Sequence, residues 1–236
     1  MMTFIDVLLV ATAAAVVVAM FALLWRERSS RRSAAVAVAS GLVLAAWAAA
    51  SAVLARRGAF IQVGHQVPPV GIALAVTLAF LAAVLMLSPT LRGLLSNQKN
   101  IIRLNVWRLV GAVFLLLMQQ GQMPALWAWP SGVGDILIGL AAFPVARRLD
   151  EPGGINRAIV FNLLGLADLV VAIGLGMMTS LGPTNVFHTT PSSQMATRYP
   201  LALVPTFLVP LAIMLHVLSL WQLHRASSRQ ASFAAA

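Results

Sequence analysis

Long apolar runs separated by short polar connections dominate the chain. A transmembrane helix needs about 20 mostly apolar residues to cross roughly 30 Å of hydrocarbon. Seven segments meet this requirement, at residues 3–25, 33–55, 69–91, 102–123, 126–146, 158–181 and 200–223. The pattern predicts an all-α integral membrane protein, a seven-transmembrane-helix bundle that forms a single domain over residues 1–224. Residues 225–236 are rich in Ser and Ala and are expected to form a flexible tail.

The composition supports this interpretation. Hydrophobic residues make up 60% of the 236 residues and charged residues only 9%, whereas a soluble domain carries about 25% charged residues. The net charge of +10 comes from short basic clusters between apolar runs, which is typical of a polytopic membrane protein and not of a nucleic-acid-binding module. We therefore expect a lipid bilayer, and no nucleic acid, as partner. Cysteine is absent, which excludes disulfides and thiolate metal sites.

The distribution of basic residues predicts the orientation of the bundle. Cytoplasmic loops of membrane proteins carry an excess of Lys and Arg. Of the 16 basic residues, 13 lie in or around the odd-numbered connections and the tail, and three lie on the other side. Arg108 is counted among those around the third connection. We predict an N-terminus outside and a cytoplasmic C-terminus. The abundance of Ala, Leu and Arg and the single Lys indicate a bacterial protein of the inner membrane.

Tryptophans recur near the ends of the predicted spans. Tryptophan prefers the membrane–water interface because its ring is apolar and its N–H is polar. Two groups are predicted to anchor the bundle: Trp25, Trp107 and Trp221 on the cytoplasmic side, and Trp127 and Trp129 on the outer side. Trp47 falls inside the second span and is expected to pack against other helices.

The fifth and sixth spans share a sequence pattern that contains an acid. Residues 132–141 and 165–174 both read Gly-x-small-Asp, followed by aliphatic and small residues. Because consecutive spans run in opposite directions, this is a short inverted repeat. Asp135 lies about nine residues, or roughly 14 Å, from the outer end of its helix. Asp168 lies about ten residues from the inner end of its own helix, so both carboxyl groups are expected near the middle of the membrane.

Placing these two carboxyl groups inside the membrane is energetically unfavourable. A carboxylate at the bilayer centre costs roughly 2.5–3.5 kcal/mol on insertion scales, so it must face a partner or water, or hold a proton. Small residues three before and four after each Asp share its helix face and permit close approach of another helix: Gly132, Gly139, Gly165 and Ala172. We predict an antiparallel contact at which the two acids approach each other. Two like charges in a low dielectric disfavour joint ionisation, so the pair is suited to take up a proton or a cation.

The residues around the first acid also match a known motif. Gly132-Val133-Gly134-Asp135 resembles the Gly-x-Gly-Asp motif of intramembrane aspartyl proteases, the presenilin-like and prepilin peptidases. The resemblance implies an intramembrane enzyme. In those families a second aspartate lies on an earlier span, whereas Asp168 comes later here. We keep this enzyme as a remote alternative and assign no catalytic residue.

Two further polar residues are predicted inside the membrane. His216 lies about two turns before the inner end of the seventh span, and Asn162 lies near the inner end of the sixth. Haem ligation in a helical bundle needs facing histidines on different helices, and only His216 is clearly intramembrane. We therefore predict no cofactor and no metal site. His216 and Asn162 join Asp135 and Asp168 as candidate substrate- or ion-binding residues.

Two prolines interrupt the seventh span. Pro205 and Pro210 lie on either side of Thr206. Each proline leaves the carbonyl four residues earlier, at Leu201 and at Thr206, without its helical donor. Broken helices mark binding sites in several transporters, so Thr206 is a further candidate binding residue. The alternative is a simple kink that improves packing.

Three classes of function fit these features. The first is transport of a small solute or ion, coupled to the intramembrane acidic pair. The second is a non-catalytic membrane subunit or scaffold that binds another membrane protein or lipid, because small residues crowd the second span over residues 45–52. The third is the intramembrane enzyme. A chain of seven spans is short for a stand-alone transporter, so we expect a homo-oligomer or a membrane-protein partner.

Overall fold

The computed structural model of the protein describes residues 2–63 and 67–234. These residues form helices and no strand, which confirms the predicted all-helical class. Within the same residues, seven helices are long and apolar enough to cross a membrane. Their lengths and composition suggest a multi-pass membrane protein.

Each predicted span corresponds to one of these helices. Five of them are single, unbroken α-helices. The other two are composite, because the fourth contains a 3₁₀ segment and the seventh begins with a π-helical turn. In chain order they are α1 (Met2–Arg26), α2 (Arg31–Arg56), α3 (Pro69–Leu87), α5–η1–α6 (Gln98–Leu104, Asn105–Gly111 and Ala112–Gln119), α7 (Ala125–Arg147), α8 (Gly154–Met178) and η3–α9 (Val204–Leu208 and Val209–Ala234). Two short elements, α4 (Pro89–Leu94) and the 3₁₀ turn η2 (Ser193–Thr197), lie in connections.

The third helix ends earlier than predicted. α3 ends at Leu87 and not at residue 91, because a proline at position 89 disfavours the α conformation of Ser88. The hydroxyl oxygen of Ser88 instead accepts a hydrogen bond from the N–H of Leu91, 3.2 Å away, and caps α4. At the other end of the chain, α9 runs to Ala234. The flexible tail expected at residues 225–236 stays a prediction, since the side chains beyond residue 225 lie outside the described residues.

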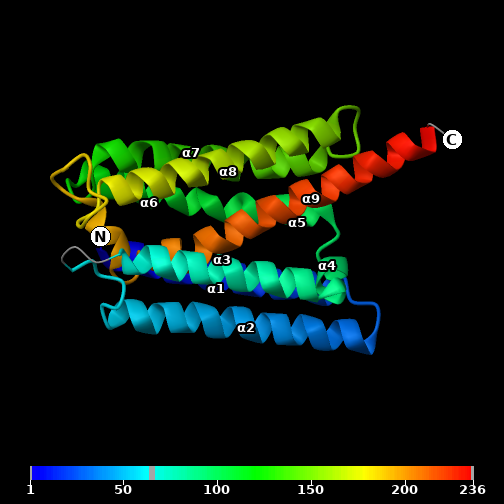
Figure 1. Ribbon diagram of the computed structural model, residues 1–236, viewed down its shortest axis with the longest axis horizontal. Coiled ribbons are helices and arrows are strands. Elements are labelled where there is room, and N and C mark those ends of the chain that lie inside the picture. Colours follow the sequence, from blue (N-terminus) through cyan, green and yellow to red (C-terminus); the bar gives the residue numbers. More distant parts are fainter. Residues whose placement is uncertain (1, 64–66, 235–236) are drawn as a thin grey trace.

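The helices form two groups joined by α9. Figure 1 shows α1, α2 and α3 on one side, α6, α7 and α8 on the other, and α9 crossing obliquely between them. α9 contacts α3, α5 and α8, in agreement with this view. We call the end at which α1 and α7 finish the basic end. The opposite end, where the connection of residues 179–203 lies, is the cap end (Figure 1).

The outer surface of the bundle is apolar. α3 contains no buried residue, and its residues Val76, Met86 and Leu87 are 63%, 77% and 82% exposed. Apolar surface on this scale is unusual for a monomer in water. Such a surface is favourable in a lipid bilayer, because hydrocarbon tails as apolar as these side chains would surround the helices.

The two prolines of the seventh span do not leave open carbonyls. The carbonyl of Leu201 accepts a hydrogen bond from the N–H of Val204 at 2.9 Å, and the carbonyl of Thr206 accepts one from Nε1 of Trp47 at 3.1 Å. The Thr206 hydroxyl donates to the carbonyl one turn earlier, at 2.7 Å. The structure therefore favours the packing alternative at this kink. Trp47 packs as predicted, edge-on against Phe207 with 4.8 Å between ring centroids.

Two of the tryptophans predicted as anchors do not occupy an exposed position near a span end. Trp127 is 6% exposed, and its Nε1 donates to the carbonyl of Ala172 at 2.8 Å. Trp107 lies in η1, halfway along its span. Trp127 lies near the start of α7, as predicted, but faces α8, because closeness to a span end does not tell which helix face a side chain occupies. Trp107 lies deeper than predicted because its helix begins at Gln98, four residues before the predicted span. Trp25, Trp129 and Trp221 are exposed, at 39%, 56% and 38%.

Candidate functional site

A buried arginine joins the two acids. Arg108 lies in η1, midway along the fourth span, and is 0% exposed. Its Nε lies 2.7 Å from Oδ1 of Asp135 on α7, and its Nη2 contacts Oδ2 of Asp168 on α8. The planar guanidinium presents several donors in a fixed fork, which suits it to bind two carboxylates at once.

Arg108 was predicted on the cytoplasmic side but lies midway along the fourth span, so this prediction is wrong. The helix begins at Gln98, four residues before the predicted span, so Arg108 lies ten residues from its start. The available signal was a basic residue inside an apolar segment. It was missed because the positive-inside rule counts basic residues near the ends of spans together with those in the loops. Without Arg108, twelve of the original 13 basic residues remain on that side, against three.

Two glycines make room for the carboxylates. A Cβ at Gly134 would collide with Oδ1 of Asp168, and a Cβ at Gly111 would collide with the side chain of Asp135. The structure thus brings Asp135 and Asp168 together on antiparallel helices, with one guanidinium bonded to both.

The small residues chosen from the pattern pack closely, but against other helices than expected. An added Cβ at Gly132 would lie 2.8 Å from Leu115 of α6, and one at Gly139 would lie 3.0 Å from Leu109 of η1. Gly165 faces α9. The predicted contact between the fifth and sixth spans therefore does not use these glycines, because the two helices are rotated so that Gly134 faces α8 instead.

His216 closes the site from α9. It is 0% exposed, and its ring occupies the space that a side chain at Gly165 would fill. Its Nε2 lies 3.3 Å from Nη1 of Arg108. A guanidinium only donates, so Nε2 accepts and the imidazole is neutral, with its proton on Nδ1. Nδ1 donates to Oδ1 of Asn162 at 2.8 Å.

A hydrogen-bonded chain continues from the imidazole toward the basic end. It runs from Asn162 Nδ2 to Ser219 Oγ (2.8 Å), from Ser219 Oγ to Gln98 Oε1 (2.7 Å), from Gln98 Nε2 to Gln222 Oε1 (2.6 Å) and from Gln222 Nε2 to the Leu95 carbonyl (2.8 Å). Every donor points the same way. Three members of the chain are side-chain amides, which do not release their protons, so the chain is not a proton relay. It holds the imidazole of His216 in place and fills this end of the bundle.

Thr206 lies apart from this cluster. It precedes His216 by ten residues on the same helical rod, which corresponds to about 15 Å at 1.5 Å per residue. The structure therefore places the predicted candidates Asp135, Asp168, His216 and Asn162 in one cluster and Thr206 outside it.

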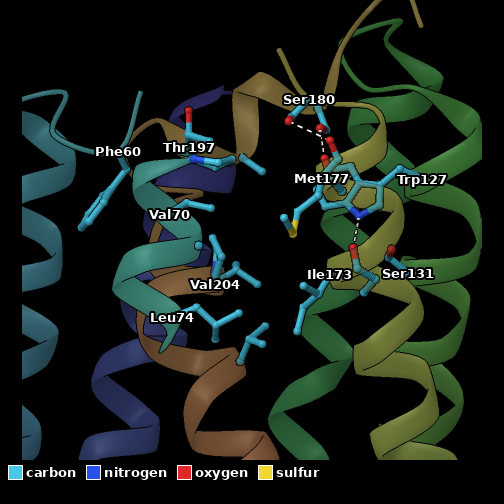
Figure 2. Close-up of a pocket in the computed structure, with 18 of the residues that line it drawn as sticks. Phe60, Val70, Leu74, Trp127, Ser131, Ile173, Met177, Ser180, Thr197 and Val204 are labelled. Atoms are coloured by element: carbon cyan, nitrogen blue, oxygen red, sulfur yellow. Dashed lines mark hydrogen bonds between the residues drawn. The ribbon is translucent and has the colours of Figure 1, made fainter. Parts of the chain in front are cut away.

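On the cap-end side, the site borders a cavity of about 110 Å³. Asp135 lines it together with Ser131 and Trp127, which lie one and two turns earlier on α7. Figure 2 shows Val70 and Leu74 of α3 across the cavity from Ile173 and Met177 of α8. Gln194 and Thr197, from the connection at the cap end, also line it, so the cavity extends from mid-span toward that end.

The charges of the cluster do not cancel. With the imidazole neutral and both carboxyl groups ionised, the guanidinium and the two carboxylates carry a formal charge of −1. The side chains of Asp135 and Asp168 are 14% and 12% exposed, whereas that of Arg108 is 0% exposed. Buried charges in proteins are normally paired, so the excess negative charge favours a further cation at this place.

Sequence reasoning also missed Ser131 and Ser219. Ser131 lies four residues before Asp135, and Ser219 lies three residues after His216, so each shares a helix face with a residue that was singled out. This spacing was the available signal.

The structure does not support the resemblance to aspartyl proteases. Those enzymes use two carboxylates that share one proton. Here the guanidinium of Arg108 binds both Asp135 and Asp168. The glycine before Asp135, which completes the motif, makes room for Asp168.

Comparison with known proteins gives one match. No curated protein and no solved structure matches the chain. The family described as Domain of unknown function (DUF8737) matches residues 67–224, which is about two thirds of the chain. This range runs from just before α3 into α9, so it contains the whole charged cluster and leaves out α1 and α2. The chain therefore belongs to the family Domain of unknown function (DUF8737).

Proposed function

We propose that the protein is a carrier of the bacterial cytoplasmic membrane that moves a small solute together with a proton or Na⁺. The observation that supports this most is the buried triad of Arg108, Asp135 and Asp168, with its formal charge of −1 in the middle of three spans. Ionisable groups at membrane depth are costly and mark ion or proton pathways. The carrier acts as a homo-oligomer or with a membrane-protein partner.

The proposed orientation has the cap end outside and the basic end in the cytoplasm. It is supported by the twelve basic residues that belong to the basic end, against three at the cap end. One of these three, Arg56, donates to the hydroxyl of Tyr199 at 2.8 Å and stacks on its ring. A basic residue on the outer side runs against the positive-inside rule, but Arg56 has a structural role there, because it binds Tyr199 of the cap-end connection.

In the proposed mechanism, Arg108 acts as a resident cation that an incoming cation displaces. A proton or Na⁺ that binds at Asp135 or Asp168 weakens the hold of that carboxylate on the guanidinium. A ligand shifts a conformational equilibrium by its differential affinity for the two states. Here the states differ in whether Arg108 holds both carboxylates or one.

The 3₁₀ segment gives Arg108 a way to move. η1 is seven residues long, whereas 3₁₀ runs longer than three or four residues are uncommon and often mark a hinge. Converting seven residues from 3₁₀ (about 2.0 Å per residue) to α-helix (about 1.5 Å) shortens the segment by about 3.5 Å. A change of this size is enough to draw the guanidinium away from one carboxylate.

Access to the site is asymmetric. The cavity reaches Asp135 from the cap end, while the amide chain from Asn162 to Gln222 fills the basic end. We assign this arrangement to an outward-facing state. Alternating access then requires the amide chain to open when the cation is bound.

The test uses proteoliposomes on a solid-supported membrane, where cation binding within the membrane gives a transient current. We expect wild-type protein to respond to a jump in pH or in Na⁺, and the two jumps tell the ions apart. Asp135→Asn and Asp168→Asn should reduce the current at least tenfold. Asp150→Asn is the matched control, because Asp150 pairs with Lys99 and its side chain is 75% exposed. Currents unchanged in the first two variants would contradict the proposal and favour the scaffold alternative.

A further inference from the structure

The cavity beside Asp135 is mostly apolar and has a few polar groups on its wall. Apolar side chains line most of it: Leu74, Phe114, Leu169, Ile173, Val204 and Val209. The polar groups come from two places: Ser131 and Asp135, on successive turns of α7, and the cap-end connection, which contributes Gln194 and Thr197 among others. A ligand in this space meets mostly hydrocarbon and a few oxygen atoms, so a small amphipathic molecule with one polar head fits it best.

Two buried polar atoms on the cavity wall have no hydrogen-bond partner within the described part of the chain. Oγ of Ser131 is one, in a residue that is 1% exposed, and Oε1 of Gln194 is the other, in a residue that is 8% exposed. A buried polar atom without a partner is unfavourable, and a ligand that forms a hydrogen bond with it removes this cost. Both atoms accept hydrogen bonds, and Ser131 lies about 6 Å along the helix axis from Asp135.

We propose that the cavity binds a small primary alkylammonium ion, and that this is the solute class that the protein carries. The inference rests on the proposed cation site. The ammonium group donates N–H bonds to the carboxylate of Asp135 and to Oγ of Ser131, and its charge offsets the formal −1 of the triad. The alkyl group packs against Leu169 and Ile173.

The volume sets the size of the alkyl group. An apolar cavity of about 150 Å³ accommodates benzene, with six carbons. The cavity of about 110 Å³ therefore has room for about four or five carbons by the same scale. Butylammonium is the natural probe, because 1-butanol and butyrate have the same carbon chain with a neutral and an anionic head.

Binding is measured with purified wild-type protein in detergent, by calorimetry and by tryptophan fluorescence, since Trp127 lines the cavity. We expect butylammonium to bind, 1-butanol to bind at least tenfold more weakly and butyrate not to bind. Ser131→Ala should weaken butylammonium about tenfold, because one hydrogen bond to a charged group is lost. Ser51→Ala is the matched control: Ser51 is 4% exposed and lies on α2, away from the cavity.

Filling the cavity gives an independent test. Ala172→Leu should abolish butylammonium binding, because Ala172 lines the cavity. Ala167→Leu makes the same change on an exposed face of the same helix and should leave binding intact. Equal affinity for butylammonium and 1-butanol, or unchanged affinity in both Ser131→Ala and Ala172→Leu, would overturn the inference. Absence of butylammonium binding with intact pH or Na⁺ currents would overturn this inference alone, whereas absence of both would overturn the proposed function as well.

Discussion

Nε of Arg108 lies 2.7 Å from Oδ1 of Asp135, although the two residues are 27 positions apart and belong to different helices. The same guanidinium binds Asp168 and also donates to the Gly165 carbonyl at 3.3 Å. One side chain thereby connects the fourth, fifth and sixth spans in the middle of the bundle. We therefore expect both the stability of the bundle and the chemistry of the site to depend on this residue.

Replacing Arg108 by Met should destabilise the protein by about 3–5 kcal/mol, since removal of one partner leaves buried charges uncompensated. The measurement is the free energy of unfolding in a detergent titration followed by tryptophan fluorescence. Arg103→Met is the matched control, because Arg103 lies on the same span but is exposed near the basic end. We expect a change within about 0.5 kcal/mol for that variant.

The charge balance of the triad can be tested separately from its packing. The triple variant Arg108→Met, Asp135→Asn, Asp168→Asn carries no formal charge at these positions. It should recover a large part of the stability that Arg108→Met loses, because the uncompensated carboxylates are gone. A triple variant as unstable as the single one would show that packing, and not charge, determines the loss.

Gly134→Ala should disturb the triad from the backbone side. A Cβ at this position would collide with Oδ1 of Asp168, so the carboxylate or the helix must shift. We expect a loss of about 1–3 kcal/mol from overpacking. Gly174→Ala serves as control, since an added Cβ there meets nothing within 4 Å, and a helical alanine is favoured over glycine. Equal effects of the two substitutions would contradict the observed packing of α7 on α8.

Ser219→Ala should break the hydrogen-bonded chain that holds His216. The hydroxyl accepts from Asn162 and donates to Gln98, so its loss leaves one donor and one acceptor without a partner. The expected cost is about 1–3 kcal/mol, measured by thermal unfolding in detergent. Ser51→Ala, at a similarly buried position outside the chain, should cost clearly less. Equal losses would argue that the chain contributes nothing beyond burial.

Trp47→Phe should destabilise the seventh span. It removes the donor to the Thr206 carbonyl, and a carbonyl left unbonded inside the bundle costs about 1–3 kcal/mol. Adding Pro210→Ala restores a backbone N–H four residues after Thr206 and should recover part of this loss. Trp129→Phe, at a residue that is 56% exposed, is the control. No recovery in the double variant would mean that the ring contact with Phe207 matters more than the hydrogen bond.

The sequence by itself determined the helices and the depth of the acids. A span of about 20 apolar residues must be helical in lipid, because its backbone groups have no other partners, and local chemistry at Ser88 and Pro89 sets where α3 ends. The constant rise of a helix then places Asp135 and Asp168 at mid-span. These features depend on residues close together in the chain.

Only the tertiary structure decided which groups meet. Helix rotation determines that Gly134, and not Gly132 or Gly139, faces the sixth span, and that Arg108 points inward between two acids. The cavity likewise forms between α3 and α8, which are distant in sequence. Helix rotation and tilt follow from packing against neighbouring helices. That packing involves residues far apart along the chain, so the pattern of any single span does not contain it.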